Sequence, residues 1–447
     1  SVPFRLNTEL RPWDLNGKDV RRSGVSAFGF GGTNFHAVME EYIPGKITSE
    51  YKKSHFISEI PASGSKNLKK PLRGLVVTGA ESNVAMITKL EALESKVKTG
   101  WTPQVEVPLQ KDLQANIRIS IDFADNAELL DKIGRALKAL RSEKKAMWKV
   151  LNAKGVFLGE GKPGKAAFLF TGQGSQYVNM LQKLRQTEPI VAETFREADE
   201  IMTPLLGMPL TDYIFIDSND KEKVDQANYD LQQTEITQPA MLTADTALFR
   251  LASEYGIQPD MVIGHSLGEY GALVASNAMT FKDALLAVSA RGHQMAKVKV
   301  EDKGTMAAIF TSPDNINEIL KGIKDYVVIA NINSYGQSVI GGSTKGVEDA
   351  MIAAKAAGYH VATLPVSHAF HTEIVAPASG PLREVLADFK LEKPQIPIIS
   401  NVTGEFYPEK DGMREEMLDL LSQQVASPVQ FVKGINKLYD KGVRIYV

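Results

Sequence analysis

One stretch of the chain has the spacing of a nucleophilic serine, GHSLG at 264–268. The apolar residues MVI precede it and a helix-like run, LGEYGALVASNA, follows, which together predict the strand–turn–helix of a nucleophile elbow. In such a turn Ser266 takes a strained backbone, and Gly264 and Gly268 let strand and helix approach closely. The hydroxyl is then left exposed at a helix N-terminus, where amide dipoles favour a developing oxyanion. The alternative is an ordinary glycine-rich turn.

A serine hydroxyl needs a base to activate it. His265 adjoins the serine, but in an elbow a flanking side chain points away from the nucleophile. The stretch VSHAFHTE at 366–373 follows a strand, in a loop of the kind where α/β sheets keep their chemistry. A metal site is disfavoured because the chain has no Cys, no H-E-x-x-H and no helix with histidines at i and i+4. The candidate bases are His265, His293, His360, His368 and His371.

Arg291 stands 25 residues after Ser266, at the end of the apolar run DALLAVSARGHQM, which predicts a helix. On the residues alone, a cation in that position is typical of a helix end or of a surface ion pair.

The composition of the 447 residues is that of a globular protein with two or three domains. Hydrophobic residues make up 43%, charged residues 23%, and the net charge is −2, which argues against coating nucleic acid or an anionic membrane. The absence of Cys excludes disulfides, thiolate zinc sites and a cysteine nucleophile, and it predicts a cytoplasmic protein. The start without Met and the end within a strand-like run suggest a piece of a larger polypeptide.

The chain before the serine region divides into two parts. Residues 1–44 contain two strand-like runs around a glycine turn. Residues 45–163 begin with a polar stretch, in which 45–75 hold seven Lys/Arg against two Asp/Glu, and continue as a small α/β domain. Its expected strands are 72–77, 116–123 and 155–159, and its helices are 81–97 and a second one carrying Leu129 to Leu140.

Residues 164–447 form the part that must position the serine. A buried strand at 166–170 ends in TGQGSQ, and a helix is expected from 237 to 256 with Thr237 as its N-cap. Residues 303–366 run in the order β-α-β-β-α-β, which predicts a ferredoxin-like subdomain. It is inserted in a larger α/β body made of 164–302 and 367–447.

Seven segments together resemble one family, the malonyl-CoA:acyl-carrier-protein transacylases, and more closely the acyltransferase domains of type I polyketide and polyunsaturated fatty acid synthases. The resemblance covers 165–447 and implies an α/β-hydrolase-like core. Upstream, PFRLNTELRPW and GVSAFGFGGTNFHAVMEE are similar to the C-terminal end of a ketosynthase, and the region between matches a ketosynthase-to-acyltransferase linker. The segments are, in order, AAFLFTGQGSQ, GHSLGEYGAL, SARGHQM, ANINSYGQSVIGG, VSHAFHTE, SNVTG and QQVASPVQF.

The resemblance implies a role for each catalytic residue. Ser266 would carry the acyl group, and His368 would be its base, oriented by the backbone carbonyl of Gln424 in place of a carboxylate. Gln173 and the backbone N–H of Leu267 would form the oxyanion hole, at about 3 kcal/mol for each donor.

Arg291 would bind the carboxylate of a malonyl group through two parallel hydrogen bonds and so reject acetyl. The tetrad from His368 to His371 resembles that of malonyl-specific domains. Phe370 would fill the space that a 2-methyl branch needs, at an overpacking cost of about 1–3 kcal/mol. Leu267 agrees with malonyl, and His371 would be a packing or hydrogen-bonding neighbour and not a second base.

The resemblance thus implies transfer of malonyl from malonyl-CoA to the phosphopantetheine thiol of an acyl carrier protein, in polyketide or fatty acid synthesis. The implied partners are that carrier and the other domains of a parent synthase, including the ketosynthase. Neither nucleic acid nor a membrane is among them, and no metal or redox cofactor is needed. A ketosynthase needs a cysteine nucleophile for condensation. Because the chain has no Cys, residues 1–44 are expected to have only a structural role. The alternatives are an acyl-thioester hydrolase and a mainly architectural fragment that docks a carrier through the lysines at 66–70.

Overall fold

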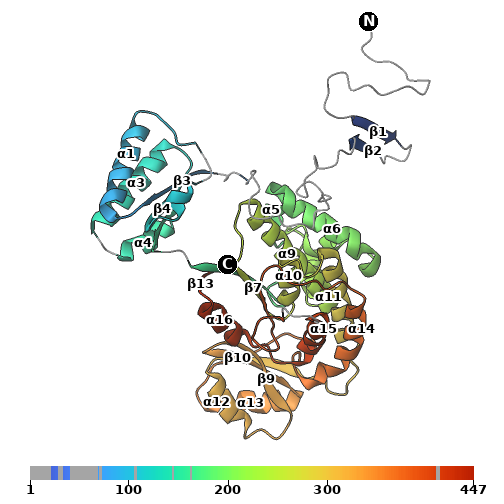
Figure 1. Ribbon diagram of the computed structural model, residues 1–447. Helices are drawn as coiled ribbons and strands as arrows, with labels where there is room; N and C mark the ends of the chain where they lie inside the picture. Colours follow the sequence, from blue (N-terminus) through green and yellow to red (C-terminus); the bar gives the residue numbers. More distant parts are fainter. Residues whose placement is uncertain are drawn as a thin grey trace, which may run out of the picture. The chain divides into compact units, whose positions relative to one another are not determined.

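The chain is described by a computed structural model, and it separates into two compact units, 1–59 and 60–447 (Figure 1). In the first unit, β1 (Arg22–Phe28) pairs antiparallel with β2 (Asn34–Glu40). These are the two strands that the sequence predicts around its glycine turn. The described residues are 22–28, 34–40, 69, 73–104, 108–142, 145–161, 164–408 and 413–447.

Residues 74–160 form a small domain around one antiparallel sheet of order β3-β4-β5. Along the central strand, Ile117, Ile119, Ile121 and Phe123 alternate with half-buried residues, so that one face of the sheet packs on the helices. The three predicted strands and two predicted helices are present, with ends shifted by a few residues. They are β3 (Gly74–Ala80), α1 (Asn83–Lys98), β4 (Ile117–Phe123), α3 (Asn126–Ser142) and β5 (Val156–Glu160). Two short helices, α2 (Gln110–Leu113) and α4 (Lys145–Asn152), were not predicted.

The larger body is built on a parallel sheet of order β12-β7-β6-β13. Successive side chains of β6 point to opposite faces of the sheet and so belong to two different hydrophobic cores. Phe168 and Phe170 join the core made with the long helices, while Ala167 and Leu169 face α16 on the other side. The strands are β6 (Lys165–Phe170), β7 (Met261–Gly264), β12 (Ile398–Ile399) and β13 (Val443–Tyr446), and α16 is Phe431–Asp440.

A set of helices, α5 to α11, lies in the chain between β6 and the inserted sheet, and it includes the helices next to the predicted serine. The predicted N-cap of α9 is wrong, because the helix begins at Thr234 after Gln233. Thr237 lies inside the first turn, where its hydroxyl donates to the carbonyl of Leu231. The helices are α5 (Gln182–Thr187), α6 (Pro189–Leu206), α7 (Leu210–Ile214), α8 (Lys221–Asp230), α9 (Thr234–Glu254), α10 (Gly268–Ala275) and α11 (Phe281–Ala296).

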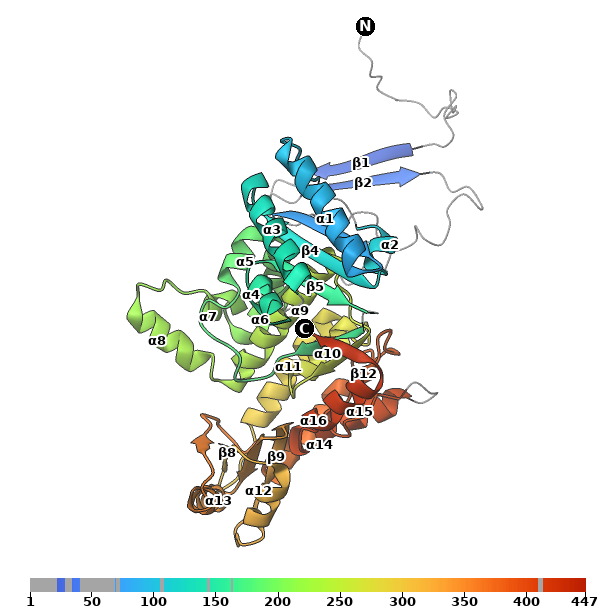
Figure 2. The same cartoon turned by 90° about the vertical axis from the view of Figure 1, so that its left-hand side faces the viewer.

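Residues 305–363 form the inserted unit in the predicted order β-α-β-β-α-β. Its sheet is antiparallel with the order β11-β8-β10-β9, and its two helices pack on one face around Ile309, Ile340 and Val347 (Figures 1 and 2). The elements are β8 (Thr305–Ile309), α12 (Pro313–Leu320), β9 (Val327–Ser334), β10 (Gln337–Gly342), α13 (Thr344–Ala356) and β11 (Val361–Thr363).

The chain then returns to the body through short helical segments. They are η2 (Glu373–Ala378), α14 (Ser379–Ala387), α15 (Met413–Gln423) and η3 (Gln424–Ala426). Within the described part of the chain, no helix combines the length and the apolar character needed to cross a bilayer.

Candidate active site

The predicted elbow connects β7 to α10. Ser266 has a φ of 51°, the left-handed conformation that a nucleophile elbow requires of a residue with a side chain. A Cβ on Gly264 would lie 2.0 Å from the carbonyl carbon of Gly268, and one on Gly268 would lie 2.1 Å from the carbonyl oxygen of Phe170. The two glycines therefore have the mechanical role that the sequence predicts.

Asn401, which follows β12, holds the backbone of the elbow through two hydrogen bonds. The backbone N–H of Ser266 donates to Asn401 Oδ1 at 2.5 Å, and Asn401 Nδ2 donates to the carbonyl of Gly264 at 2.7 Å. The serine is also less accessible than predicted, because it is only 8% exposed. The reason is that the returning loop and α11 cover the hydroxyl.

The assignment of His368 as the histidine facing the serine is wrong. The hydroxyl of Ser266 lies 2.8 Å from Nε2 of His371. His368 instead turns its Nδ1 toward the hydroxyl of Ser367 at 3.1 Å, and its Nε2 has no hydrogen-bond partner among the described residues. The ring centroids of His368 and Phe370 are 6.1 Å apart, so these two side chains lie next to each other.

The backbone explains why His371 reaches the serine. His371 has a φ of 60°, and its N–H donates to the carbonyl of Val425 at 2.9 Å. Its Nδ1 faces two carbonyl oxygens, of Gln424 at 2.9 Å and of Ser427 at 3.1 Å. Since carbonyls only accept, we assign the proton to Nδ1, which leaves Nε2 free to accept the serine proton. The carbonyl of Gln424 thus orients a histidine as the resemblance implied, but that histidine is His371.

Burial and charge keep the imidazole of His371 neutral. The pKa of His371 is lowered to about 3, first by complete burial and then by the nearby guanidinium of Arg291. The pKa of His368 is also lowered, by burial and then by Lys303.

The other three candidate histidines lie elsewhere. His265 points away from the serine, as predicted, with its Nε2 2.8 Å from Asn333 Oδ1. His293 pairs with Glu235 in an exposed position, and the ring of His360 meets the ring of Phe310 edge to face. Among the described residues, no group of three acidic, histidine or cysteine side chains is arranged to hold a metal ion.

Arg291 lies in the site and not on the surface, since it is 0% exposed. Its Nη2 donates to the hydroxyl of Ser266 at 3.2 Å and to Gln424 Oε1 at 3.1 Å. Its Nη1 donates to Gln238 Oε1 at 2.8 Å, while its Nε is buried without an acceptor among the described residues. Burial lowers the pKa of this guanidinium.

A buried carboxylate that the sequence reasoning missed completes the network. Glu269 accepts hydrogen bonds from the side-chain amide of Gln424, the hydroxyl of Tyr407 and the backbone N–H of Asn401. The same amide nitrogen of Gln424 donates to the carbonyl of Ser266 at 3.0 Å. Burial raises the pKa of Glu269 to about 7. Both residues lie in segments that carry the family resemblance, Glu269 in GHSLGEY and Asn401 in SNVTG. Neither residue was assigned a function from the sequence.

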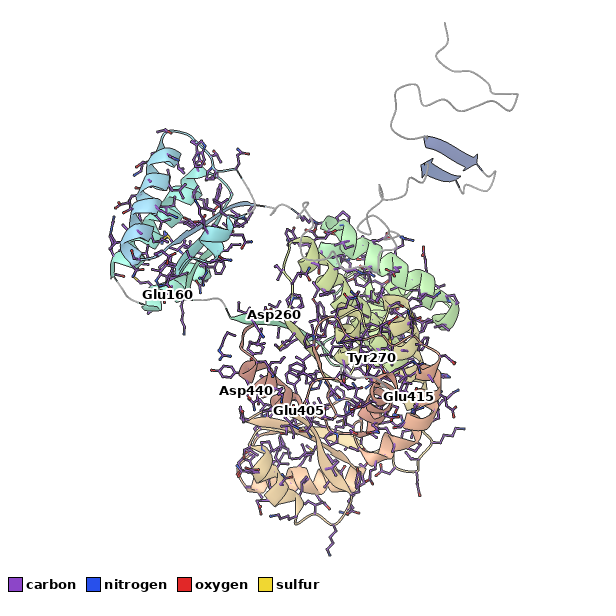
Figure 3. The ribbon with its side chains drawn as sticks, viewed as in Figure 1. Glu160, Asp260, Tyr270, Glu405, Glu415 and Asp440 are labelled. Atoms are coloured by element: carbon purple, nitrogen blue, oxygen red, sulfur yellow. The ribbon has the colours of Figure 1, made fainter. Side chains whose placement is uncertain are left out.

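Next to Glu269, Tyr270 lies inside the helical part of the body, where Figure 3 labels it. Its hydroxyl is buried and has no hydrogen-bond partner among the described residues. Burial raises the pKa of this phenol.

The loop after β6 lies against the elbow. A Cβ on Gly172 would lie 2.4 Å from the carbonyl oxygen of His265, so the next residue, Gln173, is close to the turn. The carbonyl oxygen of the Gln173 side chain accepts a hydrogen bond from Thr234 at 3.3 Å. No backbone or side-chain acceptor among the described residues takes the N–H of Leu267.

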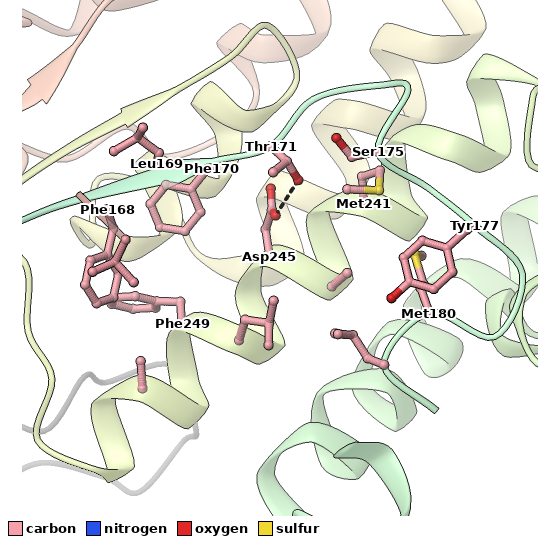
Figure 4. A pocket seen from close by; sticks show the side chains of 15 residues that line it. Phe168, Leu169, Phe170, Thr171, Ser175, Tyr177, Met180, Met241, Asp245 and Phe249 are labelled. Carbon is pink, nitrogen blue, oxygen red and sulfur yellow. Dashed lines mark hydrogen bonds between the residues drawn. The ribbon is translucent and has the colours of Figure 1, made fainter. Parts of the chain in front are cut away.

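A carboxylate of α9 anchors this loop at Thr171. Asp245 accepts a hydrogen bond from the hydroxyl of Thr171 at 2.9 Å, and burial raises the pKa of Asp245 to about 7 (Figure 4). The two residues border a largely apolar cavity of about 310 Å³ between β6 and α9, whose lining includes Phe168, Phe170 and Phe249. Ser266, His371 and Arg291 do not line it.

Residues 167–447 match the acyl transferase domain family. The chain belongs to this family. A malonyl CoA-acyl carrier protein transacylase of Bacillus subtilis is 40% identical over 291 residues, which are 63% of this chain and 86% of that protein. A polyunsaturated fatty acid synthase protein of Thraustochytrium is 27% identical over 99% of this chain, but the chain spans only 16% of its length.

Solved structures of this acyl transferase family agree with the fold. The malonyl CoA-acyl carrier protein transacylase of Clostridium perfringens is 34% identical over 63% of this chain and 85% of that one, with a TM-score of 0.56. A malonyl-transacylase solved in complex with its type II polyketide synthase acyl-carrier protein is 33% identical over 62% of this chain and 86% of that one, with the same TM-score.

Proposed function

We propose that the chain transfers a malonyl group from malonyl-CoA to the phosphopantetheine thiol of an acyl carrier protein, through an ester on Ser266. The observation that carries the proposal is the 2.8 Å contact between the Ser266 hydroxyl and Nε2 of His371, next to the buried Arg291. A nucleophile, a neutral base and a buried cation are what the transfer of an anionic acyl group requires.

In the first half-reaction His371 takes the proton of Ser266 as Oγ attacks the thioester carbonyl. The tetrahedral oxyanion lies in the hole formed by the backbone N–H of Leu267 and the loop that carries Gln173. When the intermediate collapses, the carbon–sulfur bond breaks and the imidazolium returns its proton to the CoA sulfur. The carbonyls of Gln424 and Ser427 hold the ring through Nδ1 and stabilise the imidazolium, in the place that a carboxylate has in other serine enzymes.

The second half-reaction runs the same steps with another thiol. His371 removes the proton of the phosphopantetheine thiol, whose sulfur attacks the ester carbonyl. The carbon–oxygen bond to Ser266 then breaks, and the proton passes from His371 to Oγ. The kinetics are therefore ping-pong.

Arg291 is the residue that selects a dicarboxylic acyl group. Its guanidinium is fully buried and meets only neutral acceptors, so a carboxylate gains two charge-assisted hydrogen bonds that an acetyl group cannot make. Phe370 and Leu267 are both buried and exclude a 2-methyl branch, which favours malonyl over methylmalonyl.

The parts of the chain have proposed identities as well. Residues 164–447 form an acyltransferase domain, whose core, 164–302 and 367–447, is hydrolase-like. The unit at 303–366 is a ferredoxin-like subdomain, a proposal supported by its strand order β11-β8-β10-β9. Residues 45–163 are a ketosynthase-to-acyltransferase linker and 1–44 a ketosynthase tail, which is supported by relatives among type I synthases that match nearly the whole chain. The other domains of such a synthase are then partners, and the location is cytoplasmic.

Intact-protein mass spectrometry after brief incubation with malonyl-, methylmalonyl- or acetyl-CoA tests the proposal. We expect a malonyl adduct that is absent from Ser266→Ala and weak with the other two donors. Addition of an acyl carrier protein should then move the adduct onto the carrier. Release of free CoA without any adduct would instead favour a thioester hydrolase.

The docking alternative is weakened by the one described residue of its lysine cluster. The ammonium of Lys69 pairs with Glu188, whose side chain is only 2% exposed, and lies near Glu254. A lysine held in this way is not free to meet an acidic carrier. The rest of the cluster lies outside the described residues.

A further inference from the structure

Arg291 touches the nucleophile itself. Among the described residues, its hydrogen-bond acceptors are the amide oxygens of Gln238 and Gln424 and the hydroxyl of Ser266. Glu269 attracts the guanidinium through space but makes no hydrogen bond to it, and the amide of Gln424 lies between the two groups. A buried guanidinium with neutral acceptors and an unused Nε donor retains an unmet capacity to bind an anion.

This contact occupies the serine. The hydroxyl of Ser266 has one proton and two lone pairs, and the proton faces Nε2 of His371 at 2.8 Å. A lone pair accepts from Arg291 Nη2 at 3.2 Å, and a hydrogen bond from a cation draws electron density away from the oxygen. The same guanidinium opposes protonation of the base, since it contributes to the lowered pKa of His371.

We propose that Arg291 restrains the Ser266 hydroxyl until a carboxylate on the acyl donor takes over the guanidinium, so that the malonyl carboxylate activates the nucleophile that attacks its own thioester. The inference rests on the proposed function and adds a mode of regulation to it. A carboxylate accepts far more strongly than a hydroxyl, and it can bind Nη2 together with the unused Nε in a bidentate pair.

Two changes at the site follow from that exchange. The lone pair of Ser266 is released for attack, and the charge that opposed protonation of His371 is neutralised. Selectivity is then partly a matter of rate, because a donor without a carboxylate meets a restrained serine even when it is bound.

The restraint can be measured without malonyl-CoA. Phenylmethanesulfonyl fluoride is a neutral reagent, with which serine Oγ forms a sulfonate ester while fluoride leaves and the serine proton passes to the base. The rate of modification of Ser266 in the whole chain, followed by intact mass, is compared in sodium acetate and in sodium chloride of equal ionic strength. Acetate supplies the carboxylate as a separate molecule, and we expect it to accelerate the wild-type reaction about tenfold.

Two variants sharpen the measurement. Arg291→Met keeps an unbranched, flexible side chain and removes the donors, so the serine should react quickly in chloride and show no response to acetate. Lys297→Met removes an exposed cation just after the same helix and should respond as the wild type does.

The proposal is overturned if acetate leaves the wild-type rate unchanged or slows it, or if Arg291→Met responds equally. The first of these results requires only the wild-type protein, so the proposal can be overturned even if the variant does not fold. It is also separate from the proposed function, since a malonyl adduct on Ser266 can form whether or not acetate has an effect. If malonyl-CoA gives no adduct, the proposed function fails first.

Discussion

The small domain at 74–160 and the active site each bury a cation, and they stabilise it in opposite ways. Lys132 of α3 is 7% exposed, and its ammonium lies 2.5 Å from Asp122 Oδ1 and 2.8 Å from Glu128 Oε1. It also donates to the carbonyl of Asp122 at 2.8 Å, so all three of its protons have acceptors. Arg291 is buried completely, has only neutral acceptors and leaves Nε without one among the described residues.

The contrast separates a structural charge from a functional one. Removing a cation from water costs several kcal/mol, a cost that opposite charges at close range offset, as they do around Lys132. Arg291 has no hydrogen-bonded carboxylate among the described residues, although Glu269 attracts it through space, so an anion that binds the guanidinium directly offsets more of that cost. We therefore expect changes around Arg291 to alter reactivity and changes around Lys132 to alter stability.

The largest expected effect is at the base beside Arg291. His371→Ala should lower the rate of malonyl transfer by about a thousandfold or more, because the serine loses its proton acceptor. His368→Ala should cost far less, since that imidazole does not contact Ser266. Transfer rates and melting temperatures of both variants are the measurement. A larger loss in His368→Ala, with the protein still folded, would restore the assignment made from the sequence.

The next effect is on selectivity. Arg291→Met should reduce the preference for malonyl-CoA over acetyl-CoA about a hundredfold, because a bidentate charge pair of about 3 kcal/mol is lost. The kcat/KM values for the two donors measure it, and Lys132→Met is the matched control with unchanged selectivity. An unchanged preference in Arg291→Met would contradict the assignment of Arg291 as a functional cation and Lys132 as a structural one.

A smaller effect is expected in the pH dependence of stability. The pKa of His371 is about 3 in the folded protein and 6.5 ordinarily, so between these values the unfolded imidazole binds a proton that the folded one does not. Its contribution to the free energy of unfolding is present above pH 6.5 and is lost as the pH falls. Relative to His371→Gln, the wild type should lose about 2 kcal/mol between pH 7.5 and pH 5. Urea unfolding of both proteins at the two pH values tests this, and parallel losses would contradict it.

The smallest effect is at the paired cation. Lys132→Met should lower the free energy of unfolding by about 1 kcal/mol, a modest value because Asp122 and Glu128 remain partly exposed to solvent. Thermal and urea unfolding measure it, and malonyl transfer by the same variant should match the wild type. A loss of activity without a loss of stability would give Lys132 a functional role that its contacts do not suggest.

Sequence reasoning predicted local features well where the cause was local. The left-handed backbone of Ser266 and the close approach at Gly264 and Gly268 follow from the five residues of the elbow. The alternation in β4 and the element order of the inserted unit also follow from short-range patterns. The start of α9 was missed because Thr237, a good N-cap type, closes the preceding turn instead.

Arg291 and Glu269 show where such reasoning stopped. On the residues alone Arg291 was typical of a helix end, and only the family resemblance put it in the site. Glu269 follows the elbow serine by three residues, yet its partners, Gln424, Tyr407 and Asn401, come from segments more than 130 residues away. No local pattern indicates that a carboxylate will be buried by such distant donors.

By itself, the sequence determined the residue types of the chemistry, the elbow that presents the serine and the order of elements around it, because each depends on neighbours along the chain. It could not decide between His368 and His371, which share one loop and one residue type. That choice belongs to the tertiary structure. The carbonyls of Gln424 and Val425, 53 and 54 residues further along the chain, hold His371 in a left-handed conformation with its Nε2 toward Ser266.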